Sequence, residues 1–145
     1  MRAPLAAPAL TALLLACAAP AVGAPVPGSG QAPLEPTLTS ISANILVPRC
    51  SSTACHGGSG NAPIDLGSKE AARLGMVNAS STETDLMPVV APGEPDRSYL
   101  MLKLLGTQAA AGCCDAMPPS REGDPLSDEQ ISAIANWIAN GAQDD

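Results

Sequence analysis

The sequence lacks phenylalanine, and Tyr99 and Trp137 are its only large aromatic side chains. Small domains bury a limited fraction of their surface, and aromatic side chains usually supply much of the area that they do bury. Two such residues are few for a chain of 145 residues. We therefore expect something other than aromatic side chains to fill part of the interior.

Basic residues are also scarce. Seven Lys and Arg stand against 14 Asp and Glu, which gives a formal net charge of −7. Without a basic stretch to neutralise phosphates, the chain does not have the charge pattern of a nucleic-acid-binding protein, and no nucleic acid is expected among its partners. The acidity supports solubility and can steer a basic partner, but it does not identify a chemistry.

The N-terminal apolar run is too short to span a bilayer. Residues 1–17 pair a short basic start with this run, as export signals do. The run ends in the letters LLAC, which resemble a bacterial lipobox, so we expect a lipoprotein signal peptide over 1–17 and a lipid on Cys17. Such a protein is exported and held at a membrane, in the periplasm or on the outer membrane or cell surface. The alternative is an ordinary secretory peptide cut after Ala21 or Ala24.

Residues 18–36 are rich in Ala, Pro and Gly and carry one charge. They contain no periodic apolar stripe, which is typical of a semi-extended tether. The folded domain is therefore expected over 37–143, with no internal repeat.

Helical periodicity dominates this domain. Apolar spacing and capping residues predict a helix over 38–47 ended by Pro48, a second over 69–77 capped by Ser68, a third over 95–106, and a last one between Ser127 and Gly141. The last begins with an S-x-x-Q capping box. No run alternates as a strand does. The sequence predicts an all-α domain whose long Gly- and Pro-rich loops need more than hydrogen bonds to fix them.

The single histidine lies in a cysteine cluster, VPRCSSTACHGG, over residues 47–58. Zinc would need four ligands, with Cys50 and Cys55 completed by Cys113 and Cys114 or by His56. Adjacent ligands are awkward because neighbouring side chains tend to point apart, and an oxidising compartment favours disulfides. A plain disulfide scaffold is the second possibility, but it leaves His56 unexplained.

The third possibility is a covalent haem. The attachment signal for c-type haem is C-x-x-C-H, in which both thiols bond the haem and the histidine binds iron. Here the spacing is C-x4-C-H, from Cys50 to His56, so two further residues have to loop out. Methionine is the usual second iron ligand in electron carriers. Met87 and Met117 both precede a proline in a loop, and Met117 also lies shortly before the capped last helix.

Three segments together resemble the c-type cytochrome domains of exported bacterial proteins. They are ISANILVPRC…ACHGG, VVAPGEPDRSYLMLKL and AMPPSREGDPLSDEQISAIANWIANGA, within residues 38–142. The resemblance implies a cytochrome c-like fold around one covalent haem c, with His56 as the proximal ligand and Met117 as the distal ligand. It also implies that Trp137 packs against the first helix. The protein would then be a membrane-tethered electron carrier, not an enzyme, whose partners are redox proteins.

Several alternatives stay open at this point. Cys50 either bonds the haem with Cys55, or pairs with Cys113 or Cys114 and leaves Cys55 as the only thioether. Cys113 and Cys114 form a bond with each other or have separate partners. The whole protein is alternatively a haem-free, disulfide-stabilised lipoprotein that acts as an adaptor, or a haem peroxidase or sensor if methionine does not hold the iron.

Overall fold

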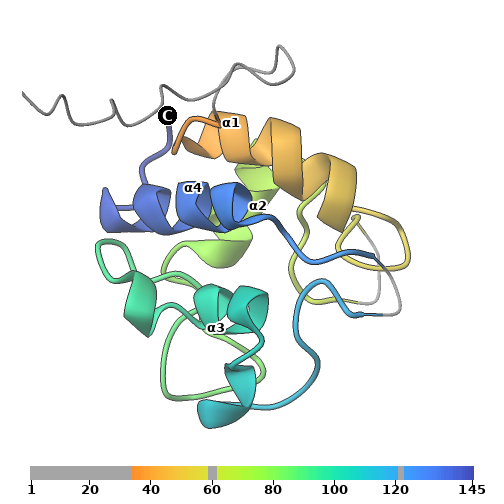
Figure 1. Cartoon of the computed structure of the whole chain (residues 1–145), viewed down its shortest axis with the longest axis vertical. Helices are drawn as coiled ribbons and strands as arrows, with labels where there is room; N and C mark the ends of the chain where they lie inside the picture. The colour runs from red at the N-terminus through yellow and green to blue at the C-terminus, as the bar shows by residue number, and fades with distance from the viewer. Residues whose placement is uncertain (1–33, 59–61, 121–122) are drawn as a thin grey trace, which may run out of the picture. The chain divides into compact units, whose positions relative to one another are not determined.

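Helices and loops make up the part of the chain that the computed structural model describes, residues 34–58, 62–120 and 123–145 (Figure 1). The four α-helices are α1 (Leu38–Ile41), α2 (Lys69–Met76), α3 (Tyr99–Leu105) and α4 (Asp128–Ala139). A π-helix, η1 (Ser42–Cys50), and two short 3₁₀ turns, η2 (Pro95–Arg97) and η3 (Gln108–Ala110), complete them. Within these residues the only β pairing is two isolated bridges, Val77 with Val90 and Ser80 with Pro88. The prediction of an all-α domain is confirmed.

Several sequence predictions lie outside this part of the chain. The signal peptide, the Cys17 lipid site and most of the tether fall on residues 1–33, which the structure does not describe. In the described ranges, no helix has the length and apolar character needed to cross a membrane.

The first helix is longer than predicted. Thr37 caps α1 by accepting a hydrogen bond from the Ser40 amide, and α1 passes directly into η1, which contains Pro48 and ends at Cys50. The expected stop at Pro48 is therefore wrong. A proline ring clashes with the carbonyl four residues earlier in an α-helix, whereas π turns pair residues five apart and displace that carbonyl. As a result the helix itself carries Cys50 to the edge of the pocket described below.

The third predicted helix is divided in two. Pro95 opens η2, and the buried Ser98 then separates this turn from α3. The Ser98 hydroxyl accepts from the Ala91 amide at 2.9 Å and donates to the Glu94 carbonyl at 3.0 Å, which explains why the chain bends there. Gly106 ends α3 with a φ of 71°, a left-handed conformation that glycine adopts at little cost.

Helix α4 begins as predicted. Ser127 accepts from the Gln130 amide at 3.3 Å, and the Gln130 side chain accepts from the Ser127 amide at 3.1 Å, so both halves of the capping box are formed. Asp128 and Glu129 in the first turn add negative charge where the helix dipole favours it.

Removing this cap should have a measurable cost. We expect Ser127→Ala to lower the free energy of unfolding by about 1 kcal/mol, because the Gln130 amide loses its side-chain acceptor. The matched control is Ser132→Ala, an exposed serine inside the same helix, which should change it by no more than about 0.5 kcal/mol. Urea unfolding of both variants measures the difference, and equal effects would show that the box contributes nothing.

The core lies where α1 and η1 pack against α2 and α4 (Figure 1). Trp137 is 1% exposed in this core, and its indole Nε1 donates to the Gln143 carbonyl at 2.9 Å. Leu34, which lies in the segment predicted as tether, packs against the same cluster. The remaining core side chains are aliphatic or methionine: Leu38, Ile41, Ile45, Leu46, Leu66, Ala72, Met76, Val89, Val90, Met101, Leu126, Ile134, Ile138 and Ala142.

Candidate functional site

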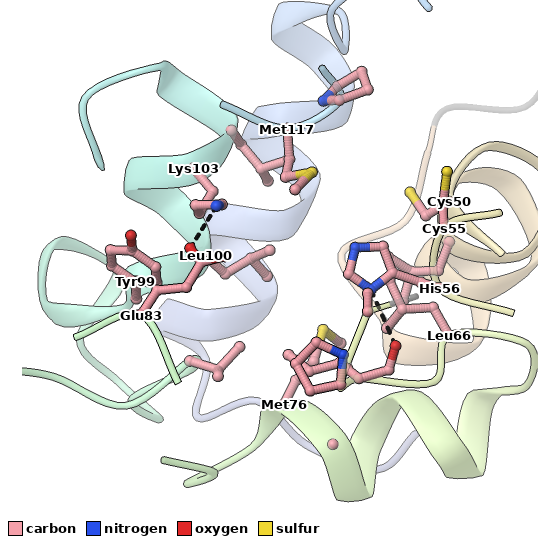
Figure 2. A pocket seen from close by; sticks show the side chains of 18 of the residues that line it. Cys50, Cys55, His56, Leu66, Met76, Glu83, Tyr99, Leu100, Lys103 and Met117 are labelled. Atoms are coloured by element: carbon pink, nitrogen blue, oxygen red, sulfur yellow. Dashed lines mark hydrogen bonds and ion pairs between the residues drawn. The ribbon is translucent and has the colours of Figure 1, made fainter. Parts of the chain in front are cut away.

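A cavity of about 550 Å³ opens beside this core (Figure 2). Its volume lies within the range of small-molecule and cofactor pockets, roughly 300–1,000 Å³. Most of its lining is apolar, and many core side chains have one side on it: Ile45, Leu46, Ile64, Leu66, Met76, Val89, Leu100, Leu104, Leu126 and Ile134. The side chains thus leave a space beside the core. That something other than aromatic side chains fills it stays a prediction.

The cysteine-histidine cluster forms one wall of the cavity. After η1 the chain turns back on itself, with the Cys55 and Gly57 amides donating to the Ser52 carbonyl at 2.9 and 3.0 Å. The His56 amide donates to the Cys50 carbonyl at 3.1 Å. A Cβ on Gly57 would lie 2.3 Å from the Ser51 carbonyl oxygen, so the turn has room only for glycine. This tight turn places Cys50, Cys55 and His56 together on the cavity lining.

The histidine ring is fixed by the segment that follows the turn. His56 Nδ1 lies 3.0 Å from the Ile64 carbonyl oxygen, and the His56 carbonyl accepts from the Leu66 amide at 2.7 Å. A carbonyl only accepts hydrogen bonds, so Nδ1 carries the proton of this bond and Nε2 is the ring nitrogen left to bind a metal. Metal-binding histidines are commonly held in this way, with one ring nitrogen on a backbone carbonyl and the other on the metal.

Asp65 closes the loop around the histidine. Its Oδ1 accepts from the amides of Gly58 and Gly67 at 2.9 and 2.8 Å. These two bonds stabilise the charged carboxylate and hold the pKa of Asp65 below its ordinary value. The carboxylate therefore stabilises the fold more than a protonated acid would.

The two hydrogen bonds to Asp65 make the free energy of unfolding depend on pH. Because the folded-state pKa of Asp65 is lowered, its contribution is complete above the unfolded-state pKa of about 3.9 and is lost as the pH falls through the folded-state value. We expect Asp65→Asn to unfold at lower urea concentration than the unchanged protein at pH 7, and the gap to close in acid below the folded-state pKa. Urea titrations at a series of pH values test this. A gap that persists unchanged in acid would contradict the assignment.

Met117 lies on the opposite wall. Its amide donates to the Lys103 carbonyl in α3 at 2.9 Å, and the following Met117–Pro118 peptide bond is cis. Figure 2 shows Met117 and His56 on opposite sides of the pocket. Met87, the other methionine that precedes a proline, is not among the residues that line it. The structure thus brings Cys50, Cys55, His56 and Met117 to one cavity.

The four cysteines of the domain are in two states. Cys113 and Cys114 form a disulfide with each other, so neither pairs with Cys50. Cys50 and Cys55 are thiols. Burial raises the pKa of the Cys50 thiol, and the nearby Arg49 guanidinium offsets only part of that increase. Two cysteines that are in no disulfide therefore lie on the cavity lining with the histidine.

A polar wall on the α3 side of the cavity was not predicted from the sequence. Lys103 is only 6% exposed, and its Nζ lies 2.5 Å from Glu83 Oε2 and 5.7 Å from the centre of the Tyr99 ring (Figure 2). The Tyr99 hydroxyl donates to the Cys113 carbonyl at 2.8 Å. Burial and the neighbouring Glu83 raise the pKa of Tyr99. Tyr99 and Lys103 are four residues apart and share a helix face, which the sequence does signal, whereas nothing local points to Glu83.

Comparison with known proteins identifies no relative. No protein-family model, curated protein or solved structure matches the chain.

Proposed function

We propose that the protein is an exported electron carrier that holds one covalent haem c in the cavity. Cys55 and Cys50 would bond the haem, and His56 and Met117 would bind its iron on opposite sides. One observation carries the proposal: His56 is bonded through Nδ1 to the Ile64 carbonyl and lines an apolar cavity beside two thiols. This donor set, an imidazole with a thioether on the far wall, matches the ligands of electron-carrying c-type haems.

The unusual C-x4-C-H spacing is compatible with this function. The two further residues lie in the turn closed by the Ser52 carbonyl, and Cys50 and Cys55 both still line the cavity. The extended η1 helix contributes to this because it carries Cys50 past Pro48. These contacts support attachment through both cysteines, with Cys55 as the essential anchor.

Packing of the helices also supports a cytochrome c-like fold. In such a fold the first and last helices meet near the haem, and here α1 contacts α4 while Trp137 is buried in the shared core. The acidic surface charge favours basic redox partners. Membrane attachment through a lipid on Cys17, with 18–36 as tether, is part of the same proposal.

The bound haem would supply reversible one-electron chemistry, and the protein would supply closure of both axial positions. With both His56 and Met117 holding the iron, no coordination position would remain for a substrate, which would favour electron transfer over catalysis. A haem peroxidase or sensor would instead need an open position.

The haem-free adaptor receives little support from the disulfide. A disulfide stabilises mainly by closing a loop in the unfolded chain, and longer loops give larger effects. The Cys113–Cys114 bond joins adjacent residues and closes no such loop. The disulfide therefore does not constrain the long loops of this domain.

A spectrum tests the proposal directly. The protein is produced together with haem-maturation machinery, its visible spectrum is recorded, and a denaturing gel is stained for haem. We expect a c-type spectrum and a haem band that survives denaturation. A colourless product with no stained band would favour the haem-free adaptor, and carbon monoxide binding by the reduced protein would favour the enzyme or sensor.

A further inference from the structure

Glu83, Cys113 and Cys114 form a second cluster of metal-ligating groups. One carboxylate oxygen and the two Sγ atoms all lie within 4.8 Å of one another. Both cysteines are exposed, and Glu83 is half-buried. None of the three is among the proposed haem ligands, although Glu83 and Cys114 also line the cavity.

We propose that this cluster is a redox-gated site for a thiophilic divalent cation of the zinc and cadmium type. In the disulfide state, both sulfur atoms are bonded to each other and the site is closed. A dithiol reductant opens it: the S–S bond breaks, the two cysteines gain two electrons and two protons, and the reductant becomes a disulfide. The cation then displaces the two thiol protons and forms two metal–sulfur bonds.

The backbone keeps the two sulfur atoms on one side. Adjacent cysteines ordinarily point apart, but Cys114 has a φ of 76°, which turns the chain. The Tyr99 hydroxyl holds the Cys113 carbonyl at 2.8 Å, and the Gln108 side chain holds the Cys114 carbonyl at 3.0 Å. None of these bonds involves sulfur, so reduction leaves them in place.

Glycine at position 112 brings the third ligand close. A Cβ on Gly112 would lie 2.8 Å from the Glu83 carbonyl oxygen and 2.6 Å from the Tyr99 hydroxyl. The chain before Cys113 therefore passes directly against the backbone of Glu83. This contact sets the carboxylate beside the two cysteines.

The charges of the cluster suit a divalent cation. Two thiolates and one carboxylate carry three negative charges. A divalent cation compensates two of these charges and leaves one negative charge. The Lys103 ammonium, 2.5 Å from Glu83 Oε2, balances the last. Thiolate sulfur with one carboxylate oxygen is a donor set that zinc and cadmium accept, with water completing four ligands.

Cadmium titration tests the site. The purified haem-loaded protein is reduced with dithiothreitol, freed of it by anaerobic gel filtration, and titrated with CdCl₂ while the ultraviolet thiolate-to-cadmium absorption is followed. Competition with a chromophoric zinc chelator gives the affinity for ZnCl₂. We expect one cation per chain after reduction and none before it. Because this comparison uses one and the same protein, it does not depend on how well any variant folds.

Variants locate the site. The double variant Cys113→Ser, Cys114→Ser should lose the signal, and Glu83→Gln should weaken binding about tenfold or more, as loss of groups around metal sites does. Asp85→Asn, an exposed acid two residues from Glu83, is the matched control and should bind as the unchanged protein does. Binding that is equal before and after reduction, or that persists in the double serine variant, would overturn the proposal. The haem spectrum, recorded in parallel, reports separately on the proposed electron carrier.

Discussion

Replacing His56 with alanine is expected to abolish stable haem loading. The chain has one histidine, so no other imidazole can take its place on the iron. The substitution removes only the ring: the backbone bonds from the His56 amide to Cys50 and from the Leu66 amide to His56 stay available. The fold of the turn is therefore kept while the iron ligand is lost, and the haem content measured by absorbance and by gel staining should fall to background.

The matched control for this variant is Met117→Ala. It removes the ligand on the other wall but leaves both thiols and His56, so covalently bound haem should persist. Normal haem content and an unchanged spectrum in His56→Ala would contradict the proposed function as a whole.

Met117→Ala should open the iron to carbon monoxide. The thioether of Met117 is the only methionine sulfur placed opposite His56 among the labelled pocket residues of Figure 2. Without this thioether, one coordination position of the iron would be open. Methionine as an iron ligand raises the reduction potential of the haem, so its loss should lower that potential. We expect a decrease on the order of 0.1 V, within the roughly 0.8 V over which axial ligands set haem potentials. Carbon monoxide difference spectra and a redox titration measure both effects.

Met87→Ala is the control for this prediction. Met87 also precedes a proline, yet it does not line the cavity, so both properties should stay nearly unchanged in that variant. If the two substitutions had reversed effects, the distal ligand would be Met87 and the assignment of Met117 would be wrong, although the haem itself would remain.

The parts of the fold that could be predicted are those decided within a few residues. Ser68 caps α2, and the Ser127–Gln130 box starts α4, because a side-chain oxygen and an amide three residues apart suffice for each. The course of the first helix could not be predicted. Whether the chain stops at Pro48 or widens into π turns depends on what the helix packs against, and η1 packs against α2.

The site divides in the same way. Cys55 and His56 are adjacent in the sequence, so their association could be predicted from it. The Ile64 carbonyl that fixes the histidine ring comes from another segment, and so does the Glu83 carboxylate that contacts Lys103. Cys113 and Cys114 were two of several possible disulfide partners from the sequence. Their bond to each other is a result of how this loop turns, which composition does not reveal.

The bond between the Met117 amide and the Lys103 carbonyl has a consequence for local opening. The last carbonyls of a helix have no partner within it. In α3 the Lys103 carbonyl accepts from the C-cap Gly106 amide at 3.4 Å and from the Met117 amide at 2.9 Å. Fraying of the last turn of α3 would thus release Met117, and departure of Met117 would remove the shorter of the two hydrogen bonds to the Lys103 carbonyl. Amide hydrogen exchange at Met117 therefore reports the opening free energy of the α3 end, and the two segments exchange as one cooperative unit.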